Sequence, residues 1–164
     1  MTTYMLQEKT GPTMKPYLVV HSGIFINCDD APFVDQILQG AKLYETRTRD
    51  TLAPCVNCWI DLIETHHDKA PIIRGRAFIE RSQRVEYDDI QARIDAKILG
   101  TPYDIKPGCS KIFYKITDAQ AYPLPVQLPR ERENHGRSWT RYVIGVMEYP
   151  IPCPSVEPET RAIE

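Results

Sequence analysis

The sequence predicts an α+β domain that is mainly β, a small β-barrel with two short helices. Most of its β-type segments follow one another without a helix between them, which argues against a parallel βαβ fold. Only two segments, 29–40 and 86–99, have the spacing and end signals of short helices. The 164 residues fit one domain of ordinary size.

The first elements are a strand and a helix. An apolar, β-branched run over 17–26 predicts a buried strand, with Gly23 as a place for a bulge. Asp29 and Asp30 then offer N-caps, and Gly40 stands where a helix would end. The predicted helix carries an apolar stripe of Phe33, Val34, Ile37 and Leu38.

The middle of the chain alternates in the manner of strands, and three are predicted over 43–49, 59–65 and 72–81. Within 86–99, Ile90, Ile94 and Ile98 recur every four residues, and Gly100 follows. This spacing predicts a second amphipathic helix with an apolar stripe of isoleucines.

The last predicted elements are a strand over 111–117, a proline-containing edge strand or strap over 122–126, a charged loop over 130–136 and a strand over 139–147. The expected organisation is therefore a leader over 1–15, the domain over 16–150 and a tail over 151–164.

Composition narrows the function classes. A net charge of −2 and a pI near 6.1 argue against a non-specific coat for nucleic acid but permit a local basic patch. No apolar run is long enough for a membrane helix, so no membrane partner is expected. Five cysteines, an odd number, favour free thiols in a reducing compartment, and the cytoplasm is the expected location.

The segment after the first helix concentrates charge on a predicted strand. Alternation places Glu45, Arg47 and Arg49 on one face and Tyr44 and Thr46 on the other. Three charges on one face suit either a solvated outer surface or the wall of a binding site.

The order Gly-x-Lys-x-x-Glu-x-Arg in this segment, formed by Gly40, Lys42, Glu45 and Arg47, resembles the signature of the ASCH domain, which is related to the PUA fold. The resemblance extends over about residues 17–147. It includes, in family order, the segment 114–118 and then Pro123, Pro125, Gly136 and Trp139.

The resemblance implies a cleft between the helix–strand junction and the barrel, which relatives use for RNA or modified nucleosides. Lys42, Arg47 and Arg49 are suited to bind phosphate or carboxylate, and Glu45 to orient a guanidinium or accept from a base. We therefore expect RNA or a small nucleotide-like ligand as partner, with no cofactor and no metal.

A second candidate cluster lies in the segment 135–141. His135, Arg137 and Ser138 follow or flank the flexible Gly136 and form a candidate ligand-facing lip. A solvated loop of mixed charge is the alternative. Trp139 is a candidate stacking platform, as is Tyr44, and a packed core aromatic is the alternative for both.

Two other functions stay open on the sequence. The family resemblance also includes amidohydrolases of the N4-acetylcytidine type and ribonucleases, which makes Lys42 and Glu45 candidate catalytic residues. Glu45 stands where the hydrolase pattern has a threonine, so that residue set is incomplete and enzymatic activity is undecided. A protein-interaction module with a solvated charged face is the third hypothesis, and the oligomeric state is undetermined.

The remaining polar residues give weaker signals. Cys55 and Cys58 have CxxC spacing but no second pair, so ordinary thiols are favoured over a zinc site. His66 and His67 fall in a predicted surface turn. His21, in the first strand, is expected to be a core or cleft-edge histidine.

Overall fold

The computed structural model describes residues 14–150 and 160–162. The chain divides into two units, one of residues 21–142 and one that combines residues 1–20 with residues 143–164. The predicted leader and tail lie almost entirely outside the described residues. Both hollows of the candidate site are lined by the unit of residues 21–142.

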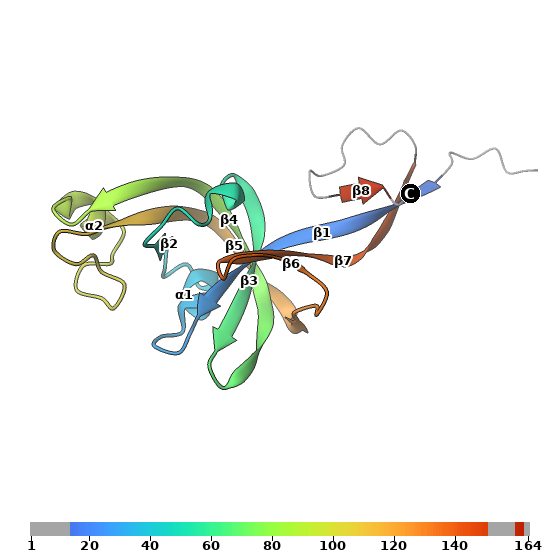
Figure 1. Ribbon diagram of the computed structural model, residues 1–164, viewed down its shortest axis with the longest axis horizontal. Coiled ribbons are helices and arrows are strands. Elements are labelled where there is room, and N and C mark those ends of the chain that lie inside the picture. Colours follow the sequence, from blue (N-terminus) through green and yellow to red (C-terminus); the bar gives the residue numbers. More distant parts are fainter. Residues whose placement is uncertain (1–13, 151–159, 163–164) are drawn as a thin grey trace, which may run out of the picture. The chain divides into compact units, whose positions relative to one another are not determined.

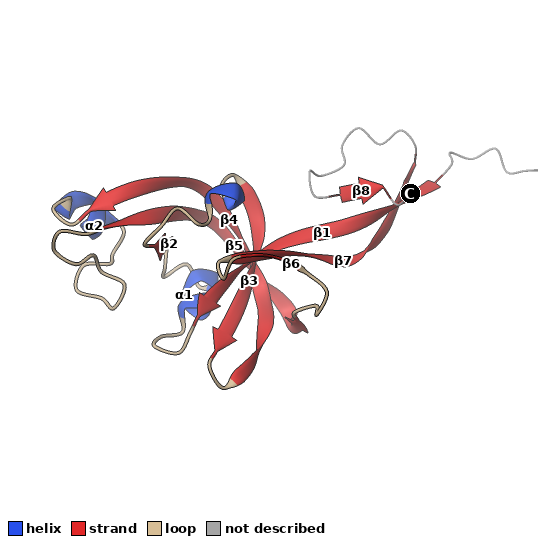
Figure 2. Cartoon of the chain, in the orientation of Figure 1, coloured by secondary structure: helices blue, strands red, loops and turns tan. Residues whose placement is uncertain are grey.

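Strands dominate the described part of the chain (Figures 1 and 2). In chain order, the elements are β1 (Met14–Asn27), α1 (Phe33–Leu38), β2 (Tyr44–Arg47), the 3-10 turn η1 (Ala53–Cys55), β3 (Cys58–His66), β4 (Lys69–Glu86), α2 (Ile90–Asp95), β5 (Ser110–Gln127), β6 (Glu133–His135), β7 (Trp139–Pro150) and β8 (Thr160–Ala162). The prediction of a mainly β fold with two short helices is confirmed.

The strands form one sheet with the order β2-β5-β4-β3-β1-β7-β6, and β8 pairs with β1. β1 runs parallel to β3, from Gly23 opposite Asp61 to Asn27 opposite Thr65. The β3–β4, β4–β5, β2–β5 and β6–β7 pairs are antiparallel. The first strand in sequence therefore lies inside the sheet, between β3 and β7.

The predicted closed barrel is wrong. Among the described residues the sheet is an open path, and no ladder joins its end strands β2 and β6. β2 has four residues, all paired with β5, and β6 has three, all paired with β7. Alternation in the sequence marks strands but does not reveal which pairs of edges meet.

The predicted proline-containing strap over 122–126 is part of β5, which pairs with β4; these are the two longest strands. Gly75 pairs with Ala121 and Ile73 with Val126, so the residues from Tyr122 to Pro125 stand outside the regular ladder at a register shift. Pro123 and Pro125 fit there because proline cannot donate to a ladder. A Cβ atom on Gly75 would lie 2.4 Å from the Gln120 carbonyl oxygen, so this close approach requires glycine.

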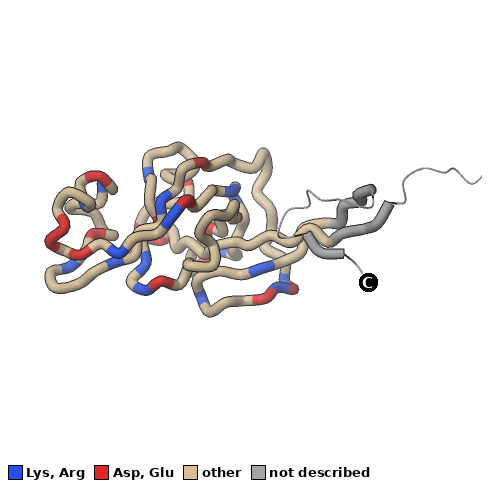
Figure 3. The backbone as a smooth tube through the Cα atoms, turned by 90° about the horizontal axis from the view of Figure 1, so that it is seen from above, with Lys and Arg blue, Asp and Glu red and all other residues tan. Residues whose placement is uncertain are grey.

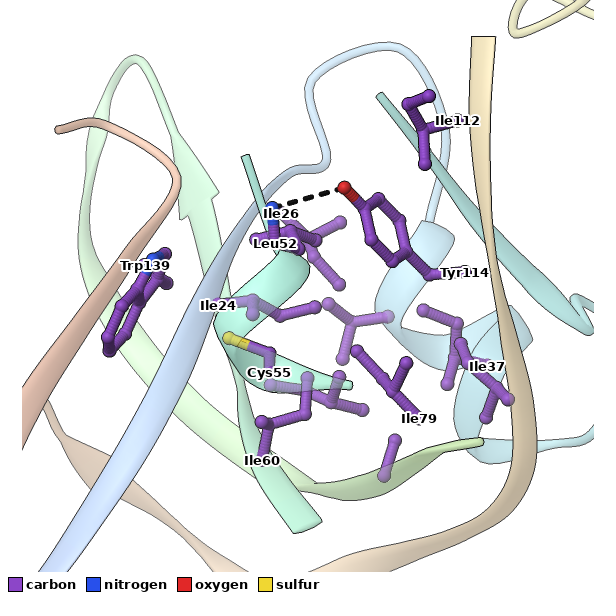
Figure 4. Packing of buried hydrophobic residues seen from close by; sticks show 14 of the residues in the cluster. Ile24, Ile26, Ile37, Leu52, Cys55, Ile60, Ile79, Ile112, Tyr114 and Trp139 are labelled. Atoms are coloured by element: carbon purple, nitrogen blue, oxygen red, sulfur yellow. Dashed lines mark hydrogen bonds between the residues drawn. The ribbon is translucent and has the colours of Figure 1, made fainter. Parts of the chain in front are cut away.

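The main core lies between α1 and the sheet (Figure 4). Val34 and Ile37 of α1 are fully buried in it. Tyr114 of β5 is also fully buried; its hydroxyl donates to Asp50 Oδ1 at 2.6 Å and accepts from the Leu52 N–H at 3.1 Å. These bonds fix the turn that follows β2.

The start of α1 differs from the prediction. The helix begins after Pro32 and has no side-chain cap, so the prediction of Asp29 or Asp30 as N-cap is wrong. Asp29 Oδ1 instead accepts from the His67 N–H in the β3–β4 turn.

The second helix is shorter than predicted and buries a different face. α2 ends at Asp95; Ile90 and Ile94 are about half exposed, and only Ile98, beyond the helix, is buried. Arg93 takes the buried position on this helix. The predicted isoleucine stripe is therefore wrong.

Within the described residues, none of the helices has the length and apolar character required to cross a bilayer.

Candidate functional site

Two hollows adjoin in the unit of residues 21–142. The first, here called the ion-pair lobe, has a volume of about 280 Å³ and is lined by Phe25, Ile26, Asn27, Asp30, Phe33, Lys42, Glu45, Thr46, Arg47, Pro102, Tyr103 and Lys111. The second, the arginine lobe, has a volume of about 490 Å³ and is lined by Phe25, Asn27, Arg47, Thr65, Arg132, Asn134, Gly136 and Arg137. Phe25, Asn27 and Arg47 line both.

The ion-pair lobe is built around one buried carboxylate. Gly40, at a φ of +75°, turns the chain at the end of α1, and Lys42 and β2 follow. Glu45 Oε2 lies 3.1 Å from Lys42 Nζ, and Glu45 Oε1 lies 3.2 Å from Arg47 Nε. Both Lys42 and Glu45 are about 7% exposed, so this is a desolvated group of charges rather than a surface pair.

The backbone orients the two cations further. Lys42 Nζ also donates to the Tyr44 carbonyl oxygen, and Arg47 Nη2 donates to the Phe25 carbonyl oxygen at 2.7 Å. Arg47 therefore ties β2 to β1. Both cations hold fixed positions before any ligand arrives, which reduces the entropy lost on binding.

The charge state of Glu45 follows from this geometry. Burial alone would raise its pKa, but the positive charges of Lys42 and Arg47 outweigh burial and lower the pKa below its ordinary value. Glu45 is therefore an anion at neutral pH. It is suited to accept hydrogen bonds and to orient cations, not to donate a proton.

Aromatic rings and a second lysine complete the ion-pair lobe. Lys42 Nζ lies 5.7 Å from the ring centre of Phe33 and 5.3 Å from that of Tyr103, within the range of cation–π attraction. Lys111 Nζ donates to the Tyr103 carbonyl oxygen at 2.7 Å. Burial lowers the pKa of Lys111. The lobe thus combines flat apolar walls with polar groups, as expected of a pocket for a ring-shaped ligand.

The arginine lobe has a different electrostatic character. Three arginines line it and no carboxylate does, although basic and acidic residues are interspersed along much of the chain (Figure 3). Arg132 is oriented by hydrogen bonds to Asn134 Oδ1 at 3.2 Å and to the Pro129 carbonyl oxygen at 3.0 Å. Arg137 is exposed, and within the described part of the chain its side chain has no ion pair. This lobe is suited to bind anions.

The structure brings the two predicted clusters together through one residue. Lys42, Glu45 and Arg47 line the ion-pair lobe, and Arg137 lines the arginine lobe, which Arg47 shares. Arg49 is exposed and lines neither.

The other predicted lip residues have supporting positions. The Ser138 carbonyl oxygen accepts from the Phe25 N–H at 3.0 Å and so holds the β6–β7 hairpin against β1. Trp139 is buried at the edge of the core (Figure 4). The His135 ring stacks on it, with 3.8 Å between ring centres. His135 Nε2 also lies 3.1 Å from Glu133 Oε1. Tyr44 packs against Phe113, with 5.9 Å between ring centres.

Several lining residues were not predicted from the sequence. Tyr103 lies between α2 and β5, and Lys111 lies at the start of β5. They are 61 and 69 residues from Lys42 and carry no motif that would link them to it. Phe25 was predicted only as part of the strand over 17–26, and Asn27 was not singled out. A strand end that is followed directly by the polar Asn27 was the signal available for them.

Cys28, Cys55, Cys58 and Cys109 are free thiols. In the described part of the chain, the one group of three or more close metal-type ligands contains no cysteine. The cytoplasmic location expected from the cysteine content stays a prediction.

The comparison with solved structures decides the fold. The crystal structure of ASCH from Zymomonas mobilis matches 65% of this chain and 73% of its own, with 18% identity and a TM-score of 0.50. The fold is that of an ASCH domain. A mutant ASCH protein from the same organism matches 71% of this chain and 85% of its own, with 18% identity and a TM-score of 0.47.

The sequence itself matches no protein-family profile and no curated protein. The ASCH resemblance is therefore confirmed at the level of the fold. At 18% identity, this likeness leaves the function to be argued from the site.

Proposed function

We propose that this ASCH-fold protein binds an RNA segment or a small nucleotide-like ligand across the two lobes, with a base in the ion-pair lobe and a phosphate in the arginine lobe. The observation that carries the proposal is the contrast between the lobes. One is walled by aromatic rings around a fixed ion pair, and the other has three arginines without a carboxylate. Arg47 stands at their junction.

The phosphate end follows from guanidinium chemistry. Arginine presents a planar set of donors that matches phosphate oxygens, often two at a time. Arg47 is already engaged, since Nη2 donates to the Phe25 carbonyl oxygen and Nε lies in an ion pair with Glu45. Arg137 and Arg132 therefore supply most of the donors available to a ligand. Lys42 is engaged by Glu45 and the Tyr44 carbonyl, so we assign it to the base pocket rather than to phosphate.

The base end follows from the ring walls and the carboxylate. Phe33 and Tyr103 pack edge to face, with 5.5 Å between ring centres, and offer apolar contact to a flat ring. Glu45 is held as an anion and can accept from an exocyclic amino group. A base that lacks an amino group would leave that acceptor desolvated, which costs affinity.

The test is the binding of short single-stranded RNA and of nucleoside monophosphates, measured by fluorescence anisotropy and calorimetry. We expect Arg137→Ala to weaken binding about tenfold or more, because it removes charge-assisted hydrogen bonds to phosphate. The matched control is Arg49→Ala, which removes the same charge from a residue outside both lobes and should change affinity less than about twofold.

Equal losses in the two variants would show that only general charge attracts the RNA and would contradict the proposal. Circular dichroism of both variants establishes that they fold. Analysis of the same RNA samples for cleavage products tests the ribonuclease alternative.

A further inference from the structure

A group of metal-type ligands lies at the tip of the β3–β4 hairpin. The carboxylates of Asp29 and Asp68 and the imidazole of His67 each offer one ligand atom, and these atoms lie within 4.8 Å of one another. Asp29 follows β1 and is 38 residues from His67 in sequence, so only the fold brings them together. All three residues are exposed and open to ions from solvent.

The central pair already has the spacing of metal ligands. His67 Nδ1 lies 3.1 Å from Asp29 Oδ1. Ligand atoms about 2.1 Å from a tetrahedral zinc ion stand roughly 3.4 Å apart, so little movement is required. Asp29 is also fixed by its backbone, because its N–H donates to Asn27 Oδ1 at 2.8 Å and Oδ1 accepts from the His67 N–H at 3.1 Å.

A second histidine, His66, lies beside Asp29. His66 Nδ1 is 3.6 Å from Asp29 Oδ1, and His66 Nε2 is 3.6 Å from Glu64 Oε1. Glu64 is buried and held by Arg74, whose Nη1 donates to Glu64 Oε2 at 3.0 Å. These carboxylates make the surroundings of the group negative, which favours a cation there.

We propose that Asp29, His67 and Asp68 form a binding site for a divalent transition-metal cation of the Zn²⁺ class. Two carboxylates balance the charge of the ion, and the imidazole nitrogen favours Zn²⁺ over Mg²⁺, which prefers oxygen ligands and its own waters. Water completes the coordination. His67 would bind through Nδ1 as a neutral imidazole, with its ring proton on Nε2.

The site is separate from both lobes, since none of its three ligands lines either one. It is close to them in the chain, however, because Asn27 and Thr65 of the arginine lobe are near neighbours of Asp29 and His66 in sequence. The proposal stands independently of nucleotide binding.

The test is calorimetric titration of the full chain with ZnCl₂ and, in parallel, with MgCl₂. We expect one Zn²⁺ site, weakened about tenfold or more by His67→Ala and by Asp29→Asn, and much weaker binding of Mg²⁺. The matched control is Asp88→Asn, which removes an exposed carboxylate from the turn before α2 and should leave Zn²⁺ affinity unchanged.

Cobalt absorption spectra separate this site from the free thiols. Co²⁺ bound by nitrogen and oxygen ligands lacks the thiolate charge-transfer band, so a spectrum without that band is expected. Unchanged Zn²⁺ affinity in His67→Ala, or a strong thiolate band that disappears in Cys109→Ser, would overturn the proposal.

Discussion

Glu45 is a single carboxylate shared by two cations, Lys42 and Arg47, in a buried position. Its lowered pKa means that the folded state binds the ionised form better than the unfolded state does. The stabilisation that it contributes is therefore present at neutral pH. It is lost as the pH falls from the ordinary glutamate value of 4.5 through the lower value in the folded protein.

Replacement of Glu45 should reveal this contribution. We expect Glu45→Gln to lower the free energy of unfolding at pH 7 by about 3 kcal/mol, because it leaves Lys42 buried without its counter-charge. The difference from the parent should shrink as the pH falls well below 4.5, where Glu45 in the parent also becomes neutral. Urea unfolding of both proteins at a series of pH values measures it.

The double variant Lys42→Met with Glu45→Gln is the control. It removes both charges and should be more stable than Glu45→Gln alone, since no buried lysine is left unpaired. A double variant less stable than the single one would contradict the view that the penalty comes from the stranded charge.

At the scale of elements, the segment between α2 and β5 positions one wall of the ion-pair lobe. Arg93 Nη2 lies 2.7 Å from both carboxylate oxygens of Asp104, and Arg93 Nε lies 3.0 Å from Oδ1. Asp104 also accepts from the Gly100 N–H at 2.9 Å. These hydrogen bonds of Asp104 therefore fix the loop that places Tyr103 in the wall of the ion-pair lobe.

Loss of the ion pair between Arg93 and Asp104 should make this loop more mobile. We expect Asp104→Asn to speed amide hydrogen exchange over residues 98–106 by about tenfold or more and to weaken ligand binding through Tyr103. Hydrogen-exchange mass spectrometry measures the change. Asp95→Asn, which alters an exposed carboxylate at the end of α2, is the matched control and should leave exchange in the loop unaltered.

The elements also show what the sequence could and could not predict. Strands and helices were found where one face is apolar over several residues, as in β1, β3 and α1. The stripe of Ile90, Ile94 and Ile98 failed because α2 ends at Asp95. Arg93 is buried in place of Ile90 and Ile94 because Asp104 neutralises it, and a hydrophobicity pattern does not contain that pairing.

For the molecule as a whole, the order of strands and helices along the chain was predictable. Whether the sheet closes into a barrel was not. The Gly40–Arg47 motif could be recognised because its residues lie close together in sequence. It supplied Lys42, Glu45 and Arg47 to the lining of the ion-pair lobe. The rest of the lobe depends on where β1 and the segment after α2 meet β2 in space. Alternation also overestimated the length of β2 and missed β6, the two strands at the ends of the open sheet.

The net charge of −2 makes a whole-molecule prediction about salt. A chain without general basicity should attract RNA through the arginine lobe alone, so few counter-ions are released on binding. We expect a shallow dependence of log affinity on log salt concentration, with a slope that falls by about 0.7 in Arg137→Ala. Titrations at several salt concentrations measure it; an identical slope in parent and variant would contradict a phosphate contact at Arg137.

The place of β1 in the sheet bears on how the protein is made. Because β1 lies between β3 and β7, one of its edges finds a partner early in synthesis, while the other waits until more than a hundred further residues have left the ribosome. During that interval an apolar strand presents open backbone groups to the crowded cell, where they invite pairing with other nascent chains. The β6–β7 hairpin, which carries Arg137, thus also covers the open edge of β1, a strand synthesised long before it.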